Sequence, residues 1–94
     1  MAETILRLVA ERGPGKSICP SEAARAFAEA RRRPADPPDS WRRYMNAARQ
    51  QARFLARAGR ITILRKGKPV DPTAPVKGVI RLAPAGDPKL DDHG

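Results

Sequence analysis

Two kinds of residue in this sequence could do chemistry, a lone cysteine and a large set of arginines. Cys19 precedes Pro20 in the segment "SICPSEAARAF", where a helix is expected to begin. The positive end of a helix favours a thiolate, so a redox-sensitive thiol is physically possible there. However, no second cysteine is present to form an internal disulfide, and the only histidine, His93, lies in an acidic segment. We therefore interpret Cys19 as a packing residue and expect no enzymatic activity; a Cys19 thiol sensor stays as an alternative.

The balance of charge points to an anionic partner. The 94 residues carry 19 Lys and Arg against 10 Asp and Glu, a net charge of +9. The last twelve residues contribute −2, from three Asp and one Lys, so residues 1–82 carry +11. Such an excess predicts a polyanionic partner. One cysteine and one histidine do not provide metal-ligand spacing, so no metal or cofactor is expected. The sequence has no long apolar run or leader-like start, so we expect a cytoplasmic protein without membrane contact.

The first 30 residues predict two helices separated by a short extended segment. Ile5, Leu8 and Val9 have the spacing of one helix face over residues 3–11, and "RGPGK" ends this helix. Residues 16–18 are expected to be extended. Pro20 is suited to the first position of a second helix, which runs to about residue 30, and Glu22 can reach back to the Cys19 amide. The expected inner face of the second helix consists of Ala23, Ala24, Phe27 and Ala28.

A third and longest helix follows the proline-rich loop "RRRPADPPDS". Ser40 is expected to cap this helix, which spans residues 41–58 and ends at Gly59. One stripe along it is apolar and predicted to face the core: Trp41, Tyr44, Met45, Ala48, Ala52 and Leu55. A second stripe is polar and basic: Arg42, Asn46, Arg49, Gln50, Arg53 and Arg57.

The C-terminal part predicts a small β-hairpin. Residues 60–65, "RITILR", and 79–82, "VIRL", are expected to be strands, and the turn-rich segment 66–78 is the loop between them. Residues 83–94 are expected to be a disordered acidic tail. The order of helices and strands is that of a winged helix-turn-helix. The predicted fold is therefore α+β, mainly α, with three helices and an antiparallel hairpin wing in one domain over residues 1–82.

Four segments also resemble a known family. "ICPSEAARA", "WRRYMNAARQQARFLARAGRITI", "KGKPVDP" and "GVIRL" are similar to an uncharacterised bacterial family of small winged-helix-like proteins, the domain of unknown function 3253. The similarity covers about residues 3–82. It implies a fold but no activity, because none has been assigned to the family. The loop "EARRRPADPPDS" is longer and richer in proline than the family pattern.

The predicted winged-helix fold and the positions of the arginines together suggest a DNA-binding function. The third helix would enter the major groove of double-stranded DNA, and the wing would hold phosphates. The predicted DNA-binding residues are Arg42, Asn46, Arg49, Gln50 and Arg53 on the helix, with Lys66 and Lys68 on the wing. Transcriptional regulation or nucleoid association is the expected context, by a monomer or a homodimer. Two other interpretations stay open: a merely solvated helix face, and an adaptor that docks an acidic protein.

Overall fold

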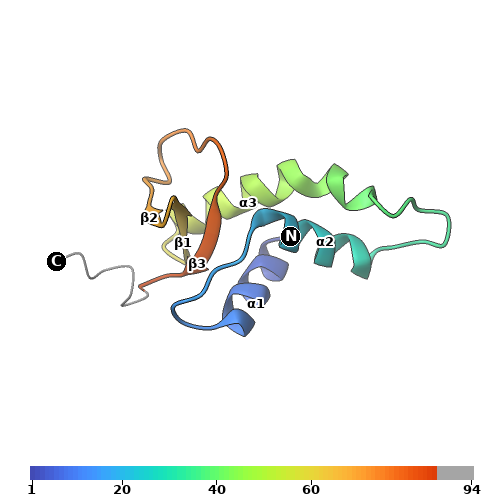
Figure 1. Ribbon diagram of the computed structural model, residues 1–94, viewed down its shortest axis with the longest axis horizontal. Coiled ribbons are helices and arrows are strands. Elements are labelled where there is room, and N and C mark those ends of the chain that lie inside the picture. The colour runs from blue at the N-terminus through green and yellow to red at the C-terminus, as the bar shows by residue number, and fades with distance from the viewer. Residues whose placement is uncertain (87–94) are drawn as a thin grey trace.

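The computed structural model describes residues 1–86 and consists of three helices followed by a small antiparallel sheet (Figure 1). This α+β, mainly helical architecture is consistent with a winged helix. Its elements are α1 (Ala2–Arg12), α2 (Pro20–Ala30), the 3₁₀ helix η1 (Ser40–Tyr44), α3 (Met45–Arg57), β1 (Ile61–Arg65), β2 (Lys68–Pro69) and β3 (Arg81–Pro84). β3 extends to Pro84, and the remaining part of the predicted acidic tail, residues 87–94, lies outside the described residues.

The first two helices confirm the expectations from sequence because their ends are encoded locally. Gly13 ends α1 with a φ of 94°, a conformation that favours glycine. Pro20 occupies the first turn of α2, and the backbone N–H of Cys19 donates to Glu22 Oε2 at 2.8 Å. Glu22 also forms an ion pair with Arg12. The carboxylate of Glu22 therefore caps α2 and connects its start to the end of α1.

The single long helix predicted over residues 41–58 is wrong in its first turn. Residues 40–44 form a 3₁₀ helix, α3 begins at Met45, and Ser40 makes no side-chain capping hydrogen bond. With three residues per turn, a 3₁₀ helix places residues i and i+3 on one side. Trp41 and Tyr44 can therefore both face α2, where the Tyr44 ring meets the Phe27 ring edge-on with centroids 5.0 Å apart.

The sheet has three strands in the order β2-β1-β3, whereas the sequence predicted a two-stranded hairpin. Lys66 and Gly67 form a tight turn with φ values of 55° and 80°, which lets Lys68 pair with Arg65. The chain then returns through residues 70–80 to β3, which pairs with the other edge of β1. β3 begins two residues later than expected, since Val79 is 85 % exposed.

A further backbone bridge links the region before α2 to the last strand. The N–H of Ile18 donates to the carbonyl of Leu82 at 2.8 Å, and the N–H of Leu82 donates to the carbonyl of Ile18 at 2.7 Å. The extended segment predicted at residues 16–18 is thus confirmed at Ile18. This bridge brings the helical and sheet halves of the molecule into one core.

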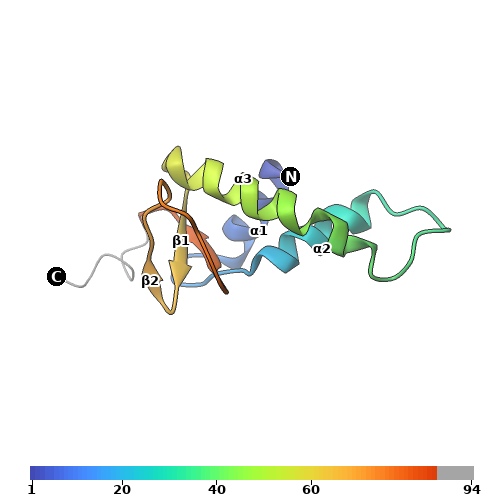
Figure 2. The ribbon, with the colours of Figure 1, turned by 90° about the horizontal axis from the view of Figure 1, so that it is seen from above.

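The core lies between the helices and the inner face of the sheet. Its buried members are Ile5, Val9, Ile18, Ala23, Ala52, Leu55, Ile61, Ile63, Ile80 and Leu82. Each fully buried Leu or Ile stabilises the fold by roughly 1.5–3 kcal/mol. Seen from above, α3 lies across the molecule with α1 and α2 beneath it (Figure 2). The inner stripe of α3 supplies the core contacts, so its opposite face is left toward solvent.

Candidate nucleic-acid interface

The outer face of α3 carries polar side chains on successive turns. Asn46, Gln50 and Arg57 are exposed, and Arg53 is half-buried between them. Residues 46, 50, 53 and 57 recur at intervals of three or four, so they share one side of the helix. We call Asn46, Gln50 and Arg53 the α3 outer face, because the Nε of Arg57 donates to the carbonyl of Pro72. Amides and guanidinium groups hydrogen-bond to base edges and phosphates, so this surface has the chemistry that DNA recognition requires.

A shallow hollow of about 380 Å³ lies beside the second half of α3. It is lined by Gln50, Gln51, Arg53, Phe54 and Arg57. The Nε atom of Arg53 is buried and has no hydrogen-bond partner among the described residues. Phe54 is 62 % exposed. A buried N–H without an acceptor is costly, so the position of Arg53 carries an energetic cost within the fold.

Arg49 does not belong to the outer face, although the sequence placed it there. Its guanidinium donates to the carbonyls of Val76 and Gly78, both at 3.2 Å, and its side chain is half-buried. Arg57 makes a similar link, because its Nε donates to the carbonyl of Pro72 at 3.0 Å. Two arginines of α3 therefore hold the loop of residues 70–80, which we call the wing loop.

Arg42 is also separated from the outer face of α3. It lies in η1, is exposed, and its guanidinium carbon is 5.5 Å from the centroid of the Trp41 ring. The change from 3₁₀ to α geometry between Tyr44 and Met45 breaks the regular spacing that the sequence pattern assumed. The structure thus brings Asn46, Gln50 and Arg53 together and leaves Arg42 with η1.

Lys66 and Lys68 lie at the tip of the β1–β2 hairpin rather than on the long loop. Both are exposed, and Figure 2 shows this hairpin running away from the end of α3. Lys77, between the two carbonyls that Arg49 holds, is instead the lysine of the wing loop and is also exposed. The structure therefore has two exposed basic segments, the β1–β2 hairpin and the wing loop, where the sequence predicted one.

The segment of residues 40–70 contains no acidic residue. No Asp or Glu lies between Asp39 and Asp71, whereas nine Arg and Lys residues do. This segment includes η1, α3, β1 and β2. Its positive charge is thus uncompensated within the segment, which favours an anionic ligand over an internal network of ion pairs.

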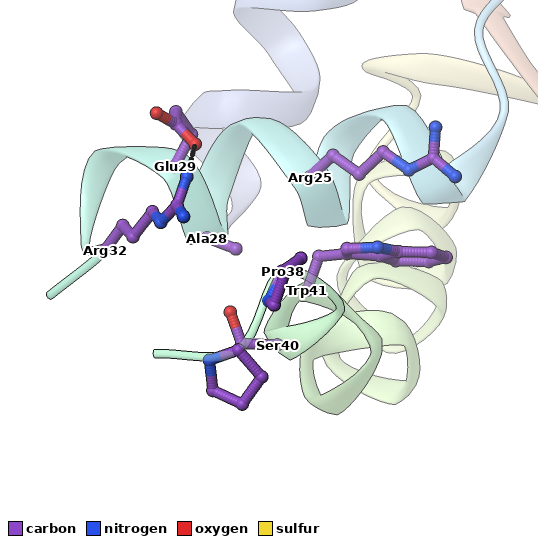
Figure 3. A pocket seen from close by; sticks show the side chains of 8 residues that line it. Arg25, Ala28, Glu29, Arg32, Pro38, Ser40 and Trp41 are labelled. Atoms are coloured by element: carbon purple, nitrogen blue, oxygen red, sulfur yellow. Dashed lines mark ion pairs between the residues drawn. The ribbon is translucent and has the colours of Figure 1, made fainter. Parts of the chain in front are cut away.

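Sequence reasoning missed a cluster at the other end of α3. Guanidinium groups lie within cation–π distance of the rings of α2 and η1: Arg25 and Arg42 over Trp41, Arg31 over Phe27, and Arg43 over Tyr44. We call these seven residues the arginine–aromatic cluster. Figure 3 shows Arg25 of α2 reaching the ring of Trp41. Only the contact of Arg25 with Trp41 joins two elements, α2 and η1, and a periodic pattern within one helix does not predict it.

A hollow of about 340 Å³ adjoins the cluster on the Trp41 side (Figure 3). It is lined by Arg25, Ala28, Glu29, Arg32, Pro37, Pro38, Ser40 and Trp41. Arg32 pairs there with Glu29 at 3.9 Å, the dashed contact in the figure. A second hollow, of about 410 Å³, is lined by Arg31, Arg33, Asp36, Arg43 and Tyr44.

Comparison with known proteins identifies the family but not the activity. The family model described as "Protein of unknown function (DUF3253)" matches residues 1–84. The chain belongs to this family. No curated protein matches the sequence. The family resemblance drawn from the four sequence segments is therefore confirmed, and the function of this DUF3253 chain has to be argued from its own residues.

Cys19 of this DUF3253 chain is part of the start of α2. The thiol is half-buried, its sulfur lies 3.0 Å from Ser21 Oγ, and it donates to Glu22 Oε2 at 3.4 Å. Burial raises the pKa of Glu22, but hydrogen bonds from the Cys19 backbone, the Cys19 side chain and Arg12 outweigh it, so the pKa is lowered overall. These contacts support a structural role for Cys19 within the helix cap.

Residues 1–86 contain neither an evident metal site nor a membrane-spanning helix. No group of three or more His, Cys, Asp or Glu residues that could hold a metal ion occurs among them. No helix in the same range is long and apolar enough to cross a membrane.

Proposed function

We propose that this protein binds double-stranded DNA, with the α3 outer face in the major groove and the wing loop against the backbone. The observation that carries the proposal is the α3 outer face itself. Asn46, Gln50 and Arg53 line one side of a helix that contains no acid, and the core covers only the opposite side. Asparagine and glutamine can pair with adenine, and arginine can pair with guanine or phosphate.

The surroundings of α3 support the same function. A winged helix presents its third helix to the groove and its wing to a neighbouring part of the backbone. Here Arg49 and Arg57 hold the wing loop against α3, so Lys77 is kept on a loop that is fixed to the helix. In this proposal Arg49 is a positioning residue that holds the wing loop, and Asn46, Gln50 and Arg53 make the base contacts.

Fluorescence anisotropy of a labelled duplex, titrated at several salt concentrations, tests the proposal. Each phosphate that the protein neutralises contributes about −0.9 to the slope of log K against log salt concentration. We expect micromolar binding and a slope steeper than about −4, which corresponds to at least about four phosphate contacts. Absence of binding at low salt would refute the proposed function.

A matched pair of variants locates the interface. Gln50→Glu places a negative charge on the α3 outer face, and Ala10→Glu makes the same change in charge at an exposed position of α1. Because a carboxylate in the groove repels DNA, we expect Gln50→Glu to weaken binding at least tenfold, and Ala10→Glu to weaken it less than about threefold. Equal losses in the two variants would show that overall charge, and not α3, determines binding.

A protein-docking role is the second candidate, and the exposure of Phe54 favours it. An aromatic side chain that is 62 % exposed beside Arg53 and Arg57 could anchor an acidic partner. In that case Phe54→Ala would abolish capture of the partner from cell extract, capture would survive nuclease treatment, and duplex binding would be weak. If DNA is the ligand, nuclease treatment should remove whatever the protein captures.

A further inference from the structure

The arginine–aromatic cluster is built from two elements that pack through their rings. α2 contributes Arg25 and Phe27, and η1 contributes Trp41 and Tyr44. The guanidinium carbon of Arg31 lies 3.6 Å from the Phe27 centroid, and that of Arg25 lies 4.4 Å from the Trp41 centroid. A guanidinium held over a ring by a cation–π contact still has N–H groups that can donate to an anion.

These N–H groups are not used inside the described part of the protein. Within residues 1–86, no oxygen accepts a hydrogen bond from the guanidinium groups of Arg25, Arg31, Arg42 or Arg43, and none of the four forms an ion pair with a carboxylate. By contrast, the guanidinium groups of Arg49, Arg57 and Arg81 all donate to protein oxygens. The cluster thus concentrates oriented donors that have no protein acceptor.

The hollow lined by Arg31, Arg33, Asp36, Arg43 and Tyr44 brings two arginines of the cluster together with Arg33. Its single acid, Asp36, already accepts the backbone N–H of Arg33 at 3.0 Å. Three guanidinium groups against one carboxylate leave a net positive charge of about two at neutral pH. Arginine matches the geometry of phosphate with paired N–H donors, so the chemistry fits a phosphodiester.

The position of the cluster relates it to α3. Figure 1 shows the connection between α2 and η1 at one end of the long axis and the sheet with the wing loop toward the other. α3 lies between them, and its 13 residues span about 20 Å. That length exceeds the width of a major groove, about 12 Å, so groups beyond both ends of the helix can reach the two flanking strands.

We propose that the arginine–aromatic cluster, together with Arg33, binds the phosphate backbone on the opposite side of the groove from the wing loop. This inference rests on the proposed function, because it places α3 in the major groove of DNA. It adds a second phosphate site, on α2 and its connection to η1, to the one expected at the wing. The protein would then contact both strands that border the groove.

The test compares two double variants that remove the same charge. Arg31→Gln with Arg43→Gln alters the cluster, and Arg7→Gln with Lys16→Gln alters exposed residues of α1 and its following loop. Loss of two phosphate contacts should make the log–log salt slope less steep by about 1.8. If the two proteins bind equally at 1 M salt, a slope difference of about 1.8 makes the affinity of the variant about 60-fold lower at 0.1 M salt. The α1 pair should change the slope by less than about 0.5.

Replacement by lysine separates phosphate binding from a purely structural role. Arg31→Lys with Arg43→Lys keeps the charge but loses the planar stacking group, so it should restore most of the slope. If both cluster variants melt well below the unaltered protein and bind DNA equally poorly, the cluster is structural and the inference is wrong. Hydroxyl-radical footprinting should also show that the glutamine pair loses protection on one strand only.

The outcomes also separate this inference from the proposed function. If the unaltered protein does not bind the duplex, both are refuted. If it binds and Gln50→Glu weakens binding, but the cluster pair behaves like the α1 pair, the proposed function stands and the second phosphate site is refuted.

Discussion

Replacing Arg49 by alanine should destabilise the protein, although the sequence pattern places this arginine on a solvent-facing stripe. The substitution removes two hydrogen bonds from a charged donor to the carbonyls of Val76 and Gly78. Such bonds contribute about 1.5–3 kcal/mol each when shielded from water, and partial exposure here halves that figure. We therefore expect the free energy of unfolding to fall by about 2 kcal/mol, which lowers Tm by about 8–16 °C for a domain of this size.

Thermal denaturation followed by circular dichroism measures this effect, and Gln50→Ala is the matched control. Gln50 lies one residue further along α3, is exposed, and its side chain makes no hydrogen bond to a described residue. Its replacement should change Tm by less than about 2 °C. Arg49→Lys should show an intermediate loss, because one ammonium group does not span both carbonyls as a guanidinium does.

The dynamics of the wing loop provide a second readout for the same variant. Heteronuclear NOE values for the amides of residues 76–79 should fall in Arg49→Ala, since the loop is no longer held by α3. If Tm stays within about 2 °C of the unaltered protein and these values do not change, the assignment of Arg49 as a positioning residue is wrong. The original interpretation as a free groove residue would then be restored.

Three further changes test the fold. Glu22→Gln should cost about 1 kcal/mol in urea denaturation at pH 7 through the weakened helix cap. Because the pKa of Glu22 is lowered in the folded protein from its ordinary value of 4.5, its contribution is present above that pH and is lost as the pH falls further, so the two proteins should converge in stability in acid. Leu82→Ala, at a position with no exposure, should cost about 2–5 kcal/mol, whereas Val79→Ala should cost under about 0.5 kcal/mol; equal losses would contradict the described core. Gly67→Ala should cost about 1–2 kcal/mol, because φ is 80° there, and an unchanged melting temperature would contradict the tight turn.

The parts of the fold that sequence could predict are those whose causes are local. The start of α2 depends on Pro20 and Glu22, which act within one turn, and its predicted bounds are confirmed. The β1–β2 turn was missed because Lys66, a lysine with a φ of 55°, is not a residue that usually marks such a turn. The family resemblance added the fold but no residue roles.

The side-chain contacts that sequence could not predict are those with partners far away along the chain. Arg49 was assigned to DNA from its place on a helical wheel, yet its acceptors lie 27 and 29 residues further along the chain. The stacking of Arg25 on Trp41 likewise needs the packing of α2 on η1. A residue pattern reports which face a side chain occupies, but not which backbone carbonyl or ring meets it.

Because of the bridge between Ile18 and Leu82, the fold cannot be completed until residue 82 has been synthesised. Arg81, next to Leu82, also donates to Ser17, which is 64 residues away in the sequence. At about 5–20 residues per second, the ribosome needs roughly 3–13 s to make the chain between these partners. Until residue 82 is made, Ile18 lacks its backbone partner and the core of the protein is incomplete.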